Sequence, residues 1–339
     1  MPERDLLVLT EQPLNAETKL EERTPPIVPA GRHYVRTHFP IPEAAQALIV
    51  DAESPRSVSL LDVRALPART LAVTLECAGN GRRFLEPAVP GEQWGLGAVG
   101  TAEWTGASLR SVLELAAFPR RAVEVLFRGA DSGVPKDLGK QVAYERSLPV
   151  DVALGDDVLV TYAMNGEPIP PEHGGPLRLV VPGWYGMASV KWLSRITPLD
   201  QPFAGFFQRD RYVIDGRPLR EIAPRAVITH PRDGDEVPAP LLEVRGYAWS
   251  GIAPIERVDV SVSDDVRVAD LDASPSPYAW RAFRMRLLVE LAARGSAMSF
   301  ELVARATDAA GNTQPLGQRW NALGYMNNAA RPVRIRVKS

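Results

Sequence analysis

The change in sequence character near Pro218–Pro224 is the feature that most limits how this chain can fold. Beyond it, short segments rich in β-forming residues follow one another at 226–230, 242–248, 257–262 and 300–306. Turn-forming runs such as Asp233-Gly234 and Asp308–Asn312 separate them. Short strands with this spacing are typical of an antiparallel β-sandwich of immunoglobulin type. The pattern predicts one such domain over residues 225–339.

The part of the chain before this boundary has a mixed pattern. A chain of 339 residues is too long for one ordinary domain, so a second is expected. Residues 31–220 combine short strands with few helical patterns, which predicts an α+β domain, and the proline-rich residues 1–30 predict an extended arm. Leu109–Ala117 predicts a helix with an apolar face, with Thr105 or Ser108 as its cap. Strands are predicted at 71–75, 123–127, 158–162 and 177–181.

Charge and composition exclude several classes of protein. The formal net charge is −2, so nucleic acid is not an expected partner. Since no apolar run approaches the roughly 20 residues needed to cross a bilayer, no membrane partner is expected. Without a visible leader, the predicted compartment is the cytoplasm, or the periplasm if a leader was removed. A single cysteine excludes an intrachain disulfide and any zinc or iron–sulfur site built from several cysteines.

That cysteine, Cys77, lies in the run Glu76-Cys77-Ala78-Gly79-Asn80-Gly81-Arg82-Arg83, directly after the predicted strand 71–75. The thiol is therefore expected at a strand end, where glycines let the chain turn. The two arginines favour the thiolate by their charge. Cys77 is a candidate soft metal ligand or nucleophile, and the alternative interpretation is a small buried apolar side chain.

Other polar segments predict an anion-binding pocket. No P-loop, dinucleotide fingerprint or HExxH motif is present, and the four histidines are too scattered for a local zinc site. Loops that carry arginine, lysine or histidine instead occur at 34–42, 173–178, 189–192 and 207–212. Planar arginine side chains together with glycine-rich backbone suit a phosphate-bearing cofactor.

These segments, in their order, resemble the sulfite oxidase family of molybdenum enzymes. The matching motifs are Tyr-Val-Arg-Thr-His-Phe-Pro at 34–40, Glu-Cys-Ala-Gly-Asn at 76–80, Tyr-Glu-Arg-Ser-Leu-Pro at 144–149, Met-Asn-Gly-Glu-Pro-Ile-Pro at 164–170, His-Gly-Gly-Pro-Leu-Arg at 173–178, Val-Pro-Gly-Trp-Tyr-Gly at 181–186, Val-Lys-Trp-Leu at 190–193 and Ala-Thr-Asp-Ala-Ala-Gly-Asn at 306–312. The likeness runs from about residue 8 to the end. It implies a mixed α/β molybdopterin-binding domain followed by an immunoglobulin-like domain that forms a homodimer.

The resemblance also implies a site. Cys77 would bind molybdenum, held by one molybdopterin. The cofactor would be cradled by Tyr34, Val35, Arg36, Thr37, His38, Asp131, His173, Arg178, Ser189, Val190 and Lys191. A small oxyanion substrate would meet Arg36, Arg82, Arg178 and Tyr212. The alternatives are a core histidine at 173, a turn-capping carboxylate at Asp131 and a half-buried strand aromatic at Tyr212.

The implied reaction is oxygen-atom transfer that oxidises sulfite to sulfate. The haem domain of animal members is not recognisable here, so no haem is expected and electrons would pass to a separate acceptor. One departure concerns the substrate, because Leu323 stands where the family pattern has an arginine, and Arg331 is a candidate substitute. The alternatives are a molybdenum reductase of S- or N-oxides, an oxidase of another sulfur compound, and a non-catalytic immunoglobulin-like binding protein.

Overall fold

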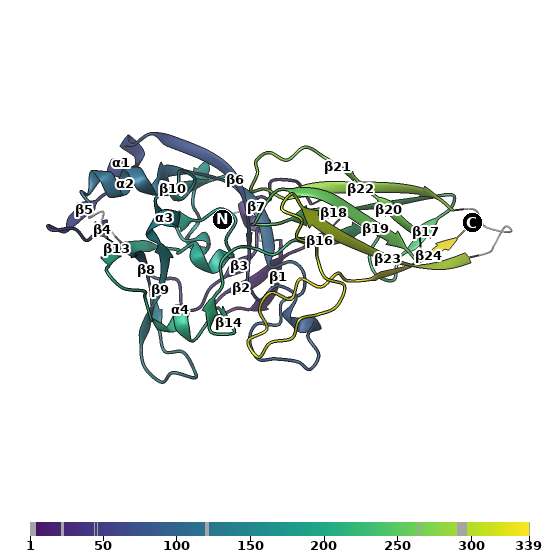
Figure 1. Ribbon diagram of the computed structural model, residues 1–339, viewed down its shortest axis with the longest axis horizontal. Helices are drawn as coiled ribbons and strands as arrows, with labels where there is room; N and C mark the ends of the chain where they lie inside the picture. The colour runs from purple at the N-terminus through teal and green to yellow at the C-terminus, as the bar shows by residue number, and fades with distance from the viewer. Residues whose placement is uncertain are drawn as a thin grey trace.

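A computed structural model describes residues 5–21, 24–43, 45, 47–118, 122–263, 265–289 and 297–338. The molecule is elongated, with an N-terminal half built of short sheets and loops and a C-terminal half built of two long sheets (Figure 1). It is rich in β-structure and has few helices. The α-helices among the described residues are α1 (Leu60–Ala65), α2 (Leu109–Leu115), α3 (Val150–Ala153) and α4 (Phe206–Arg209). None of them is long and apolar enough to cross a bilayer.

Two five-stranded sheets form the centre of the N-terminal half. The first has the order β11 (Glu167–Pro168), β10 (Leu159–Met164), β7 (Val99–Ser108) and β6 (Ala68–Glu76), with β12 (Arg178–Val180) also paired to β10. The second has the order β5 (Arg56–Val58), β4 (Leu48–Val50), β13 (Leu193–Leu199), β8 (Glu124–Gly133) and β9 (Val142–Pro149). Each of the four strands predicted here lies within or overlaps an observed one. The loops that leave these sheets carry the polar motifs.

The predicted helix is α2, which begins after Ser108. The Ser108 hydroxyl accepts a hydrogen bond from the Ser111 amide, so Ser108 is the cap and Thr105 belongs to β7. Leu109, Val112 and Leu113 are buried, as the spacing predicted. The helix contributes one apolar face to the core of this half and does not reach the polar loops.

The segment predicted as an arm contributes two strands. β1 (Leu6–Thr10) and β2 (Asn15–Thr18) pair with β3 (Val35–Arg36) in a three-stranded sheet. All four residues of β2 are buried. The Glu17 carboxylate accepts hydrogen bonds from the Gly95 and Gly97 amides, so this segment fixes the loop that faces Cys77.

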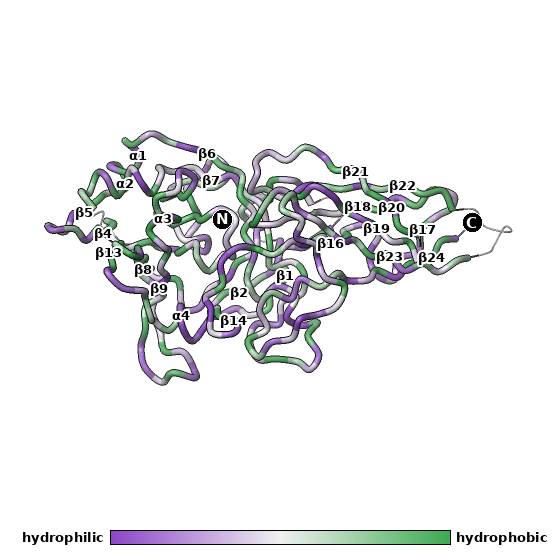
Figure 2. The backbone as a smooth tube through the Cα atoms, in the orientation of Figure 1, coloured by the Kyte–Doolittle hydropathy of each residue, from purple (hydrophilic) through white to green (hydrophobic). Residues whose placement is uncertain are grey.

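The C-terminal half is a sandwich of two sheets. One sheet has the order β16 (Arg225–His230), β18 (Leu241–Trp249), β22 (Arg281–Leu288) and β21 (Asp270–Leu271). The other has the order β17 (Glu236–Pro238), β24 (Val333–Lys338), β23 (Ala297–Asp308), β19 (Ile255–Val262) and β20 (Asp265–Val268). Hydrophobic and hydrophilic residues mix along these strands (Figure 2), and the inward-facing apolar side chains of both sheets share one core. The predicted strands of this half are confirmed.

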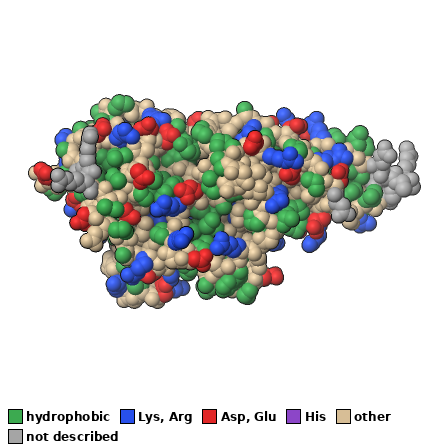
Figure 3. All heavy atoms as spheres, viewed as in Figure 1, with side chains coloured by type: hydrophobic (Ala, Val, Ile, Leu, Met, Phe, Trp, Pro, Cys, Tyr) green, Lys and Arg blue, Asp and Glu red, His purple; other side chains and the backbone are tan. Residues whose placement is uncertain are grey.

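The two halves pack closely against each other. The Thr74 amide in β6 donates to the Tyr278 carbonyl at 2.9 Å, and the Trp280 amide donates to the Thr74 hydroxyl at 2.7 Å. Tyr247 and Trp280 stack with ring centroids 4.3 Å apart at this junction. On the face drawn in Figure 3, Lys and Arg side chains alternate with Asp and Glu, so no patch of one sign covers either half. The remaining short elements are η1 (Ala30–Arg32), η2 (Arg82–Phe84), η3 (Pro171–His173), η4 (Gly186–Ala188), β14 (Val213–Ile214) and β15 (Arg217–Pro218).

Candidate functional site

A cavity that opens to solvent lies between the two sheets of the N-terminal half and the β3 segment. Its walls come from seven separate stretches of chain. The lining residues are His33, Tyr34, Val35, Arg36, His38, Leu75, Cys77, Ala78, Asp131, Tyr144, Glu172, His173, Arg178, Gly186, Met187, Ser189, Lys191, Trp192 and Tyr212. The structure therefore brings together most of the residues that the sequence singled out, although they are up to 178 positions apart.

Cys77 is held at the end of β6 by its own backbone. Its amide donates to the Ala98 carbonyl at 2.8 Å, and its carbonyl accepts from the Asn80 amide at 2.9 Å, which closes the turn. The side chain is 6% exposed and faces the cavity. Burial raises the pKa of the Cys77 thiol, although Arg36 and Arg82 lower it. Arg82 favours the thiolate by its charge, as the sequence predicted, but removal from water costs the thiolate more than the two arginines return.

Arg36, the last residue of β3 (Val35–Arg36), and His38 form one wall. The Arg36 guanidinium donates to the Asn15 side-chain oxygen at 3.0 Å and to the Thr37 carbonyl at 2.6 Å. The His38 Nε2 lies 2.6 Å from the Tyr212 hydroxyl. Burial lowers the pKa of His38 well below its usual range and raises the pKa of Tyr212 above its usual range. Two neutral groups therefore share this hydrogen bond, and the phenol keeps its proton at neutral pH.

Arg178 and Lys191 supply positive charge on the opposite side. Arg178 donates to the carbonyls of His173 at 2.7 Å and Ser189 at 3.1 Å, and its Cζ lies 4.6 Å from the Trp104 ring centroid. The Lys191 ammonium donates to the Glu172 carbonyl at 2.9 Å. These carbonyl and aromatic partners carry no full negative charge, so Arg178 stays available to an anion, whereas Asp131 and Glu172 act on Lys191 through their charges.

Asp131 and Lys191 both line the cavity, and each acts on the other through its charge. The Oδ1 of Asp131 is buried without a hydrogen-bond partner among the described residues. Burial raises the pKa of Asp131 to about 6. Burial and the neighbouring Arg178 guanidinium lower the pKa of Lys191 to about 7. A buried acceptor without a donor is costly, so a bound group with an N–H or O–H donor would stabilise this carboxylate.

Three predicted site residues lie outside the cavity lining. Arg82 donates to the carbonyls of Glu92 at 2.9 Å and Leu323 at 3.1 Å, with its Cζ 5.3 Å from the Tyr325 ring centroid. Thr37 is buried behind the wall, where its hydroxyl accepts from Lys191 at 3.3 Å, and Val190 belongs to the apolar core. Arg331 does not line the cavity either, since its Cζ stacks 4.2 Å from the Phe84 ring centroid.

Several lining residues were not singled out from the sequence. Tyr144 stacks on His38 with centroids 4.9 Å apart, and His33 meets His173 edge-on at 5.4 Å. Met187 and Trp192 complete the apolar part of the lining. Tyr144 begins one of the matching motifs, so the motif itself was the available signal. His33 precedes Tyr34 and carried no signal of its own.

Sulfate binding to the full chain without cofactor should weaken as the pH rises through about 7. Loss of the Lys191 proton removes one charge from the site, so the affinity should fall by up to roughly tenfold per pH unit. Sulfate does not titrate in this range, and calorimetry between pH 6.5 and 8.5 measures the slope. Lys191→Arg should bind with little pH dependence, because guanidinium stays charged. An equal slope in Lys191→Gln would contradict the assignment to this side chain.

Two family models match the chain. Residues 38–207 match the oxidoreductase molybdopterin binding domain, and residues 217–338 match the Mo-co oxidoreductase dimerisation domain. The chain is 33% identical to the mitochondrial sulfite oxidase of Homo sapiens over 98% of this chain and 66% of the human protein. It is 30% identical to the sulfite oxidase of Arabidopsis thaliana over 98% of this chain and 94% of the plant protein. The chain belongs to the sulfite oxidase family of molybdopterin oxidoreductases.

A solved structure of this kind is similar throughout. The sulfane dehydrogenase SoxCD of Paracoccus pantotrophus superposes with a TM-score of 0.79 at 28% identity, over 96% of this chain and 85% of that chain. The resemblance inferred from the motifs is therefore confirmed at the level of the family. The chain spans 66% of the length of the human relative.

Proposed function

We propose that the cavity holds molybdenum in molybdopterin, with Cys77 as its protein sulfur ligand. No cluster of three or more His, Cys, Asp or Glu side chains suited to a metal occurs among the described residues. A metal here would therefore take its other ligands from a cofactor, and a thiolate suits a soft centre. The unpartnered Asp131 oxygen and the cations Arg178 and Lys191 fit a group with ring N–H donors and a phosphate.

The residues proposed to hold the cofactor are those implied by the resemblance: Tyr34, Val35, Arg36, Thr37, His38, Asp131, His173, Arg178, Ser189, Val190 and Lys191. Their positions in the structure give these residues different proposed roles. Lys191 and Arg178 would bind the anionic group, and Asp131 would accept from a ring N–H. Thr37 and Val190 would act from behind the wall, Thr37 by holding Lys191 and Val190 by packing.

We infer that the reaction is oxidation of sulfite, in which sulfite and water give sulfate, two protons and two electrons for an external acceptor. When bound, the cofactor supplies the two-electron oxygen-atom transfer. Arg36 would attract and orient the oxyanion, with Arg82 adding charge from behind the wall. With the His38 Nε2–H donating to the phenol oxygen, the Tyr212 hydroxyl, kept protonated by burial, would donate its own proton in a hydrogen bond to a substrate oxygen.

A second candidate keeps the cofactor and changes the substrate. Leu323 places an apolar side chain where the family pattern has an arginine, and the structure shows no substitute from Arg331 among the lining residues. The pocket is less cationic for this reason. Oxidation of another sulfur compound, or reduction of S- or N-oxides, would suit such a pocket. The name of the SoxCD relative, a sulfane dehydrogenase, favours the first of these.

We also propose an oligomeric state, a route for the electrons and a cellular compartment. The family of the segment 217–338 supports a homodimer formed through the C-terminal domain, whose topology we propose to be of immunoglobulin type. Electrons would leave to a separate acceptor, because no haem is proposed within this chain. The cytoplasm remains the proposed compartment, or the periplasm after removal of a leader. A non-catalytic immunoglobulin-like binding protein is the candidate that binds no metal.

One preparation tests these candidates together. Molybdenum content by elemental analysis should approach one atom per chain, and sulfite should reduce an artificial electron acceptor in the same sample. Parallel assays with a sulfoxide and a reduced dye distinguish a reductase of S-oxides from a sulfite oxidase. Molybdenum without sulfite oxidation would favour a different substrate. A folded protein that binds no molybdenum, expressed where the cofactor is made, would contradict the proposed function.

A further inference from the structure

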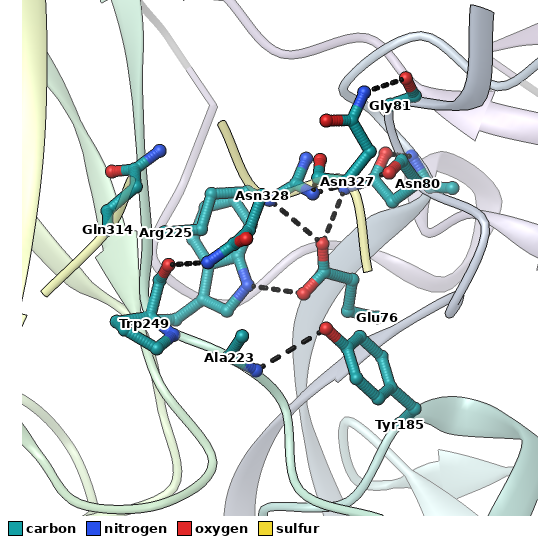
Figure 4. A network of polar contacts seen from close by, with 12 residues as sticks. Glu76, Asn80, Gly81, Tyr185, Ala223, Arg225, Trp249, Gln314, Asn327 and Asn328 are labelled. Atoms are coloured by element: carbon teal, nitrogen blue, oxygen red, sulfur yellow. Dashed lines mark hydrogen bonds and ion pairs between the residues drawn. The ribbon is translucent and has the colours of Figure 1, made fainter. Parts of the chain in front are cut away.

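Glu76, the residue before Cys77, is a buried carboxylate whose main partners come from the other half of the molecule. Its side chain is 1% exposed. Oε1 lies 3.2 Å from the Arg225 Nε, and Oε2 accepts a hydrogen bond from the Trp249 indole at 2.9 Å (Figure 4). Both partners belong to the C-terminal sandwich, on β16 and β18. Within the N-terminal half, the Asn80 side-chain amide donates to Oε1 at 2.9 Å.

The backbone of the Cys77 turn is held from the same side. Arg225 donates to the Asn80 carbonyl at 3.2 Å, and the Asn327 side-chain amide donates to the Gly81 carbonyl at 2.8 Å. The Met326 amide donates to the Ala78 carbonyl at 2.9 Å. We call Arg225, Trp249, Met326 and Asn327 the clamp. Contacts from the clamp therefore reach residues 76, 78, 80 and 81, on both sides of the thiol.

The turn depends on outside support because its own sequence is permissive. Gly79 and Gly81 leave the backbone few steric limits, and Gly81 has a φ of 83°, in the left-handed region. A side chain at Gly81 would also meet the Asn327 carbonyl 2.9 Å away, so the close approach of the clamp requires glycine. Without the clamp, these carbonyls would lose their donors and the turn could adopt other conformations.

Glu76 and Arg225 are shielded from solvent, and neither lines the cavity. Arg225 is 3% and Glu76 1% exposed at the side chain. Burying an ion pair is weak support for stability, since apolar side chains of the same volume are often as good or better. What these contacts supply is direction, because two hydrogen bonds and one ion pair fix the orientation of the Glu76 carboxylate and hence of the neighbouring residue.

We propose that Arg225 and Trp249 are positioning residues for Cys77, which hold the cysteine turn through Glu76 so that the thiol faces the cavity. The C-terminal domain would thus complete the site within one chain, in addition to any part in dimerisation. The inference builds on the proposed function only in naming metal ligation as the purpose of that placement. The clamp and the direction of the thiol stand on the contacts described above.

Because the sequence holds a single cysteine, the reaction of the chain with a thiol reagent reports on Cys77 alone. In the full chain purified without cofactor, the rate at which a thiol reagent such as DTNB modifies Cys77 at fixed pH reports how the turn is held. Arg225→Gln and Trp249→Phe should each raise that rate at least several-fold. Glu76→Gln combined with Arg225→Gln should return it toward the wild-type value, because two amides can pair without charge.

Two controls separate positioning from general destabilisation. Arg232→Gln breaks another ion pair between the halves, Arg232–Glu21 at 3.2 Å, far from the turn along the chain, and should leave the rate unchanged. Val244→Ala weakens the buried core of the C-terminal domain and gives the rate produced by lower stability alone. Urea unfolding gives the free energy of unfolding of every variant, so that the rates of Cys77 modification can be compared with stability.

In the loaded enzyme, the same clamp variants should lose molybdenum faster than wild type during dialysis. Rates for Arg225→Gln and Trp249→Phe no higher than that of Val244→Ala would overturn the proposal. If Arg225→Gln does not fold, Trp249→Phe decides, since it removes only the indole donor and part of the ring. A wild type that binds no molybdenum while the clamp variants still speed modification would defeat the proposed function and leave the positioning role intact.

Discussion

A Cys77→Ser variant is expected to lose sulfite-dependent dye reduction and most of its molybdenum. The thiol is the one thiolate ligand available at the cavity, since the sequence holds a single cysteine. A serine hydroxyl is a hard donor with a much higher pKa, so it does not replace a thiolate at such a centre. The loss of activity should exceed the roughly 10- to 100-fold that removal of an outer partner of a metal site costs. Steady-state rates and elemental analysis on the same sample measure both effects.

The fold of this variant should survive, because the substitution changes one atom at the end of β6. The backbone contacts of Cys77 to Ala98 and Asn80 do not involve the side chain. Circular dichroism and thermal unfolding of the cofactor-free protein serve as the control. Substantial turnover in purified, folded Cys77→Ser would rule out the sulfur ligand and with it the proposed chemistry.

A Leu323→Arg variant is expected to bind sulfite more tightly than the natural chain. The Leu323 carbonyl accepts from Arg82, and the neighbouring Tyr325 ring stacks on Tyr212 at 5.2 Å, so position 323 lies beside the residues proposed to meet the substrate. One charge-assisted hydrogen bond is worth about 1.5–3 kcal/mol, which corresponds to about a ten- to hundredfold lower KM. Sulfite titrations with an artificial acceptor measure KM and kcat separately.

Leu61→Arg provides the matched comparison, since it adds the same charge at a leucine that is 75% exposed on α1. Its KM for sulfite should equal that of the natural chain. If Leu323→Arg leaves KM for sulfite unchanged while remaining folded and loaded, the substrate oxyanion does not bind on this side of the cavity, and the second candidate substrate class gains support.

Local sequence patterns were enough to predict much of the framework. Alternating β-formers and turn residues marked the strands of the sandwich, and Ser108 with Leu109–Leu115 marked a capped helix. β7 (Val99–Ser108) was missed, because its glycine and alanine residues have low strand propensity. Its place is decided by pairing with β6 and β10, where a side chain at Gly106 would lie 2.2 Å from the Val160 carbonyl.

The site, like the fold, was predicted in part from the sequence and decided in part by tertiary structure. The sequence by itself determined the family, the single thiol at a strand end and most of the residues that line the cavity, because these follow from residue identity and short spacing. Tertiary structure decided which arginines face the cavity. Arg82, five positions from Cys77, is turned away by carbonyls that include one 241 positions distant, at Leu323. It also decided that burial outweighs charge at the thiol and that Arg225 holds the cysteine turn. Side-chain direction and desolvation depend on neighbours that only folding brings together, and no local pattern contains them.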